Sequence, residues 1–195
     1  MAVTSIKNKV KSGSLLVGNE AFIPNSFESI ATVTVGSGGS SSVTFTSIPS
    51  TYTHLQIRCN MQETQAGTDW DNFTARFNSD SGSNYTRHYL EGNGASVTAY
   101  GLGSRTYAFL GMVSRSGAGS SIFGVNIIDI LNYADTNKYK TIRSLSGFDR
   151  NGGGSVGLFS SAWLSTTAIS SIVLTSDSGS NFSQYSSFAL YGIKA

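Results

Sequence analysis

Hydrophobic and polar residues alternate along most of this chain with a period of two. Ala31, Val33 and Val35 alternate with threonines, and the same pattern recurs at 54–62 and 73–77. Such alternation predicts strands that bury one face and expose the other. No segment has a three-to-four-residue apolar period with caps, so we expect minimal helix. The pattern predicts about nine or ten strands in an all-β fold, an antiparallel β-sandwich of jelly-roll type.

One segment departs from this alternation. Residues 121–131 form the longest apolar run in the chain. A short continuous apolar run is typical of a strand that is covered on both sides. We therefore expect a central strand there, with both of its faces buried.

The turns between the predicted strands are rich in Ser, Gly and Asn. The hexapeptide Ser-Asp-Ser-Gly-Ser-Asn occurs twice, at Ser79–Asn84 and Ser176–Asn181. Asp and Asn tolerate unusual backbone angles, Gly adopts positive φ without strain, and Ser hydroxyls bond to nearby backbone groups. We interpret the two copies as the same turn used twice.

Residues 1–27 differ from the rest of the chain and are predicted to be an extended N-terminal arm, with 28–195 as the β-sandwich domain. Three lysines recur at intervals of two, so an extended chain presents them on one side. Two apolar patches follow. A solvated tail and an arm that docks on a partner both fit this composition, and the apolar patches favour the docking arm. The docking residues would be Lys7, Lys9, Lys11, Leu15, Leu16, Val17, Phe22 and Ile23.

Composition excludes several classes of protein. Only 12% of the 195 residues are charged and the net charge is +2, so a general nucleic-acid binder is not expected. No apolar run approaches the roughly 20 residues of a membrane-spanning helix, and no secretory signal is recognisable. The single cysteine, Cys59, excludes a disulfide within the chain and fits an inert core thiol.

Catalytic motifs are present only in weak form. Gly153–Gly157 matches the G-x-S-x-G pattern around Ser155, but a strand and not a helix is predicted to follow it. Glu63, Asp69 and Asp71 could pair carboxylates for glycoside hydrolysis or bind calcium. They fall in a predicted loop, where solvated carboxylates are usual, and no base partner is evident from the sequence. We therefore expect no catalytic residues, no metal, no cofactor and no enzymatic activity.

Glycan binding remains an open alternative. Aromatic rings that stack on sugar rings commonly lie beside carboxylates and amides. Two places in the sequence have this composition, namely Trp70 with Asp71 and Tyr133 with Asp135. Both are candidate glycan contacts, although a β-sandwich core also uses aromatic residues.

Five stretches of the chain, spread over most of it after residue 28, share a distinctive sequence character. They are Ser29–Gly39, Val43–Arg58, Phe77–Tyr85, Asn132–Gly147 and Phe188–Lys194. These stretches resemble a group of tailed-bacteriophage virion structural proteins. The resemblance implies a β-sandwich component of the virus particle, on the capsid or on the tail.

From this resemblance we expect a virion structural protein, made in the host cytoplasm. The first hypothesis is a capsid decoration (cement) protein. It would form a homotrimer on the capsid surface and bind the major capsid protein or another virion protein. The second hypothesis is a tail or fibre module that binds host-surface glycan. An enzyme that acts on polysaccharide comes third.

Overall fold

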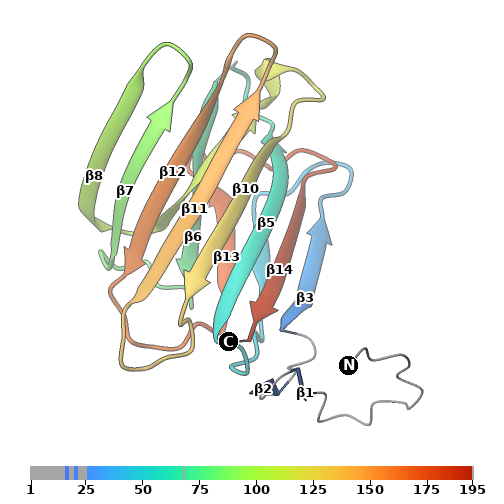
Figure 1. Cartoon of the computed structure of the whole chain (residues 1–195). Coiled ribbons are helices and arrows are strands. Elements are labelled where there is room, and N and C mark those ends of the chain that lie inside the picture. The colour runs from blue at the N-terminus through green and yellow to red at the C-terminus, as the bar shows by residue number, and fades with distance from the viewer. Residues whose placement is uncertain (1–15, 18–19, 22–25, 68, 195) are drawn as a thin grey trace, which may run out of the picture.

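The computed structural model describes residues 16–17, 20–21, 26–67 and 69–194, which form strands connected by turns (Figure 1). Twelve strands join into one mixed sheet, while β1 (Leu16–Val17) and β2 (Glu20–Ala21) form a separate antiparallel pair. Among these residues the only helical element is a three-residue 3-10 turn, η1 (Ser116–Ala118). The all-β prediction is confirmed.

Eight of the twelve strands form one antiparallel layer, which faces the viewer in Figure 1. Their order across the layer is β3–β14–β5–β10–β11–β12–β7–β8. Their bounds are β3 (Phe27–Thr34), β5 (His54–Glu63), β7 (Tyr85–Gly92), β8 (Val97–Arg105), β10 (Gly124–Leu131), β11 (Lys140–Asp149), β12 (Gly154–Trp163) and β14 (Ser187–Ile193).

The other four strands form a smaller antiparallel layer, and Figure 1 shows its strands β6 and β13 behind the larger one. Their order is β4–β13–β6–β9, with bounds β4 (Val43–Phe45), β13 (Ile172–Ser176), β6 (Trp70–Phe77) and β9 (Ala108–Arg115). The layers join where β9 pairs with β5 in parallel over two positions, Gln62 with Ser114 and Glu63 with Arg115. The jelly-roll form of the sandwich stays a prediction.

The core is built from the alternate residues that the period-two pattern selects. In β11 the buried and exposed residues alternate from Lys140 to Phe148, as expected for a strand with one covered face. Aromatic and aliphatic residues of both layers meet in the main core, and a smaller cluster lies between β9 and β12. Its buried members are Phe109, Met112 and Phe159.

Polar side chains in the interior hold β9 against the larger layer. Ser161 Oγ accepts the N–H of Phe109 (3.0 Å) and donates to its carbonyl (2.8 Å). The N–H of Met112 donates to Ser146 Oγ (2.9 Å), and the Asn126 amide donates to the Met112 carbonyl (2.9 Å). Buried backbone groups require such partners. Part of the serine content therefore belongs to the core.

The apolar run at 121–131 was expected to be buried on both faces, and this prediction is wrong. The run forms β10 in the middle of the larger layer, but Val125 and Ile127 lie 52% and 43% exposed. The buried residues of β10 are Gly124, Asn126, Ile128 and Ile130. The smaller layer covers only one face of β10, so apolar residues on the other face remain on the surface.

Most of the predicted arm lies outside the described residues. Lys7, Lys9, Lys11, Leu15, Phe22 and Ile23 belong to this part, whereas Leu16 and Val17 form β1. The expected domain boundary at residue 28 falls one residue inside β3, because Phe27 already pairs with Ile193. The docking role of the arm stays a prediction.

Candidate functional site

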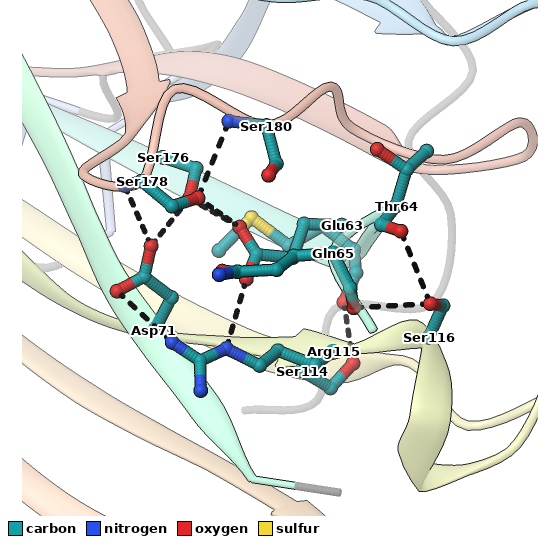
Figure 2. Close-up of polar contacts among 11 residues, drawn as sticks. Glu63, Thr64, Gln65, Asp71, Ser114, Arg115, Ser116, Ser176, Ser178 and Ser180 are labelled. Carbon is teal, nitrogen blue, oxygen red and sulfur yellow. Dashed lines mark hydrogen bonds and ion pairs between the residues drawn. The ribbon is translucent and has the colours of Figure 1, made fainter. Parts of the chain in front are cut away.

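A cluster of charged and hydroxyl side chains lies at the junction of the two layers (Figure 2). Glu63 is the last residue of β5 and Arg115 is the last residue of β9, where these strands pair in parallel. Asp71 comes from β6, and Ser176 is the last residue of β13. The ends of four strands therefore bring the two carboxylates together, although the residues are distant in sequence.

Glu63 is fully buried, and both of its carboxylate oxygens have hydrogen-bond partners. Its Oε1 accepts a hydrogen bond from Arg115 Nε at 3.3 Å, which is also an ion pair. Its Oε2 accepts hydrogen bonds from the hydroxyls of Ser176 and Ser178, the latter at 3.1 Å. A buried carboxylate needs such partners to offset its desolvation.

Asp71 shares these partners from the other side of the cluster. Its Oδ2 accepts from Ser176 Oγ at 2.8 Å and from the N–H of Ser178 at 2.7 Å. Its Oδ1 lies 3.7 Å from Arg115 Nη2. Arg115 and two serines, Ser176 and Ser178, thus contact both carboxylates, as Figure 2 shows.

The surroundings of Glu63 and Asp71 shift the pKa values of the two carboxyl groups in opposite directions. Burial raises the pKa of Glu63, assisted by the charge of Asp71 and opposed by the hydrogen bonds from Ser176, Ser178 and Arg115. Burial acts in the same direction on Asp71, but the hydrogen bonds from Ser176, Ser178 and the Asn72 backbone outweigh it and lower the pKa. Pairs of this kind are typical of acid–base sites.

Access, however, argues against catalysis at this cluster. The side chain of Glu63 exposes no surface, and both of its oxygens are occupied by Arg115, Ser176 and Ser178. A catalytic carboxylate must come within hydrogen-bond reach of the substrate. The cluster therefore fits a structural role: it connects the ends of β5, β6, β9 and β13.

The other candidates from the sequence lie apart from this cluster. The side chain of Asp69 is exposed, and its backbone carbonyl accepts the N–H of Arg115 at 3.1 Å. Ser155 lies in β12 and donates to Glu91 Oε1 at 2.8 Å. It is followed by strand and not by a helix, so the nucleophile turn that G-x-S-x-G requires is absent there.

The two glycan candidates separate in the structure. The Tyr133 ring is fully buried in the main core and its hydroxyl donates to the carbonyl of Pro49. It cannot stack on a sugar, and this part of the prediction is wrong. Trp70 is half-buried against the small cluster around Phe109. Asp71 is bonded within the carboxylate cluster, and Asp135 forms an ion pair with Lys138 at 3.3 Å.

Sequence reasoning did not identify Arg115, Ser176 and Ser178 as partners of the carboxylates. The signal available was the second hexapeptide, which contains both serines but was interpreted only as a turn. Sequence reasoning also missed Lys140 as a buried charged residue. Lys140 is fully buried, and its Nζ donates to the carbonyls of Lys138 (2.8 Å) and Thr166 (3.1 Å). Burial lowers the pKa of Lys140.

Comparisons with protein-family models, with curated proteins and with solved structures find no match to this chain. Within the described part of the chain, no three His, Cys, Asp or Glu side chains are grouped so that they could hold a metal ion. The same residues include no helix with the length and apolar character needed to cross a membrane.

Proposed function

We propose that this protein is a virion structural protein, and specifically a capsid decoration (cement) protein that binds and stabilises the assembled capsid. The structural observation that carries the proposal is the closure of the Glu63–Asp71 cluster by protein donors. Glu63 and Asp71 bond to other strands of the same chain, so they do not form an open catalytic site. The surfaces left for a function are the large faces of the sheets, which suit contact with another protein. The resemblance of five stretches to phage virion proteins is the reason for placing this contact role on a virus particle.

The fold also supports a contact role, because its two-layer architecture is one that capsid domains use. We infer a jelly-roll sandwich, because β9 lies against β10, β11 and β12 of the larger layer and the core fills the space between the layers. Sandwiches of this kind serve as capsid and lectin domains. The proposed partner is the major capsid protein or another virion protein. The homotrimer expected from the sequence stays a prediction.

Attachment is assigned to the N-terminal arm. Burial of its large apolar side chains would contribute roughly 1.5–3 kcal/mol each, against about 1–2 kcal/mol per residue for ordering the chain. Attraction between its three lysines and an acidic surface would be screened by salt. The apolar contacts should therefore dominate the binding.

The decisive test is the copy number of the protein on purified particles. Decoration predicts a copy number comparable to that of the major capsid protein. A much smaller number, combined with binding to host glycan, would instead favour the tail or fibre module.

A variant that lacks residues 1–25, which leaves all of β3 intact, should fold but fail to attach to the particle. Wild-type occupancy by this variant would remove the arm from the proposal.

A further inference from the structure

The outer face of the larger layer carries two adjacent apolar rows. Strand register places one residue of each strand beside the next, so the rows can be followed across the sheet. The first row runs from β10 to β8 through Val125, Gly147, Val156, Gly92 and Val97. The second runs parallel to it through Ile127, Leu145, Leu158, Leu90 and Ala99. We call these ten residues the apolar face.

The apolar face is on the surface of the single chain. Its seven large side chains are between 43% and 73% exposed. Because the two rows are adjacent, these side chains form one contiguous apolar surface. Contiguous exposed apolar patches are often sites of protein–protein contact. A stable contact buries about 800 Å² on each partner, so a contact here would also bury the rim of the apolar face.

We propose that a second copy of this chain covers the apolar face, in a two-fold contact between the larger layers of two molecules. A two-fold contact uses the same surface on both partners, so the surface must complement itself. The first row meets this condition, because its order Val–Gly–Val–Gly–Val is the same in both directions. Two such sheets can pack face to face about 10 Å apart, as the layers of a sandwich do.

The shape of the first row favours a second sheet as the occupant. Three valines alternate with two glycines along it, so methyl groups project above β10, β12 and β8 with gaps above β11 and β7. Gly92, Val125, Gly147 and Val156 line a hollow at this position. Projecting side chains of an identical row can enter such gaps.

The charged groups nearest the apolar face are held within the chain. The adjacent row carries Asp129 and Arg143, and these form an ion pair with each other at 3.3 Å. Gln56 donates a further hydrogen bond to Asp129 at 2.9 Å. Arg58 continues the second row beside Ile127, and its exposed guanidinium lies over the rings of Phe27 and Tyr191 of its own chain. A second copy on the apolar face would therefore leave Arg58 at the rim of the contact.

The mass of the purified full-length protein tests this proposal. Sedimentation equilibrium over a wide range of concentrations should show a species of twice the 20.6 kDa chain mass. Leu145→Lys should raise the dissociation constant at least about a hundredfold, because it buries an unpaired charge in the contact. Leu158→Thr, which keeps a strand-forming residue, should weaken the pair in the same direction but less.

Thr141→Lys is the matched control. Thr141 lies on the same strand and face as Leu145 and is exposed, but its neighbours are Leu131 and Ala162, two rows away from the apolar face. This variant adds the same charge and should change the dissociation constant by no more than about twofold. Circular dichroism melting of each variant checks that the fold is retained.

Three results would overturn the proposal. The first is a wild-type protein that stays monomeric at all concentrations. The second is an oligomer, such as the trimer expected from the sequence, whose mass Leu145→Lys leaves unchanged. The third is a monomer whose binding to capsids is lost in Leu145→Lys, which would assign the apolar face to a different partner.

Discussion

The two copies of Ser-Asp-Ser-Gly-Ser-Asn have the same six residues and different tasks. In the first copy the aspartate is the centre, because Asp80 Oδ2 accepts the indole N–H of Trp163 (2.7 Å) and its Oδ1 accepts the N–H of Gly82 (2.8 Å). In the second copy the serines are the centre, since Ser176 and Ser178 donate to Glu63. Identical side chains act here as acceptors or donors according to the neighbours that the fold supplies.

The backbone of the two copies differs as well. In the first, Asn78 and Ser79 have positive φ (52° and 60°), and the N–H of Asp80 bonds to Phe77 O, so the turn begins two residues before the hexapeptide. In the second, the N–H of Gly179 bonds to Ser176 O, so the turn begins at its first residue. The interpretation of one turn used twice is wrong, because strand pairing on either side decides where each reversal falls.

Removal of the carboxylate on which each copy's hydrogen bonds converge should give the largest effects: Asp80 within the first copy, and Glu63, the acceptor from Ser176 and Ser178 of the second. Glu63→Ala should destabilise the protein by about 3 kcal/mol, because it leaves buried hydroxyls and Arg115 without their partner. Asp80→Ala should cost less, about 2 kcal/mol, through the unpaired indole N–H of the buried Trp163. Urea unfolding of both variants measures the difference. Equal losses would contradict the distinction between the copies.

The next largest difference is expected between the glycines at the fourth position of each copy, Gly82 and Gly179, in the stability lost on substitution by alanine. Gly179 has a φ of +76° with open space around it, so Gly179→Ala should cost about 1–2 kcal/mol through backbone strain alone. Gly82 has no positive φ, and an added Cβ would lie 2.8 Å from the Asn84 amide, the movable end of a side chain. Gly82→Ala should therefore cost about 0.5 kcal/mol. Thermal unfolding measures both losses, and equal losses would contradict this difference between the turns.

The third position of the hexapeptide allows a further matched comparison. Ser178→Ala removes a hydroxyl that donates to Glu63 and should cost about 1 kcal/mol. Both Ser178 and its counterpart Ser81 are exposed, but the Ser81 hydroxyl makes no hydrogen bond to the described residues, so Ser81→Ala should stay within about 0.5 kcal/mol of wild type. Chemical denaturation with matched slopes distinguishes these values. A loss at Ser81 as large as that at Ser178 would show that the serine acts through the turn itself.

The pH dependence of stability should separate the copies in sign. Burial raises the pKa of Glu63 above its usual 4.5, so the folded state binds this proton more tightly than the unfolded state. That stability is present below pH 4.5 and is lost as the pH rises through the folded pKa. The hydrogen bond from Trp163 lowers the pKa of Asp80 below 3.8. Its stability is present above that pH and is lost as the pH falls through the folded pKa.

Melting temperatures between pH 2 and pH 8 measure both effects. Glu63→Gln should flatten the fall in stability above about pH 4.5, while Asp80→Asn should flatten the fall below about pH 3.8. These are the smallest effects expected here, because other carboxyl groups titrate in the same range. If Glu63→Gln instead flattened the change in stability below about pH 4.5, the upward shift assigned to the pKa of Glu63 would be wrong.

Local pattern was sufficient for most of the strands. The segments expected at 54–62 and 73–77 became β5 (His54–Glu63), one residue longer at its end, and β6 (Trp70–Phe77), three residues longer at its start. Alternation predicts a half-buried strand because it is set by neighbouring residues alone. The same reasoning failed at β10, where an apolar surface produces the same run of residues as a buried strand.

The carboxylate cluster was predictable only in part. Glu63 and Asp71 lie eight residues apart and were named together as candidates. Ser176 is 113 residues from Glu63 and Arg115 is 52 residues from it. No short-range pattern marks them as partners, because the contact depends on which strands end at the same place.

The sequence by itself determined that this protein is all-β, where most strands lie and which residues carry acidic chemistry, since period and residue type are local properties. Tertiary structure alone decided that Glu63 is closed off, that two identical hexapeptides make different turns, and that apolar rows remain on the surface. These outcomes depend on the order of strands in the two layers. Burial and pairing are set by that order, whereas alternation records only that one face of each strand differs from the other.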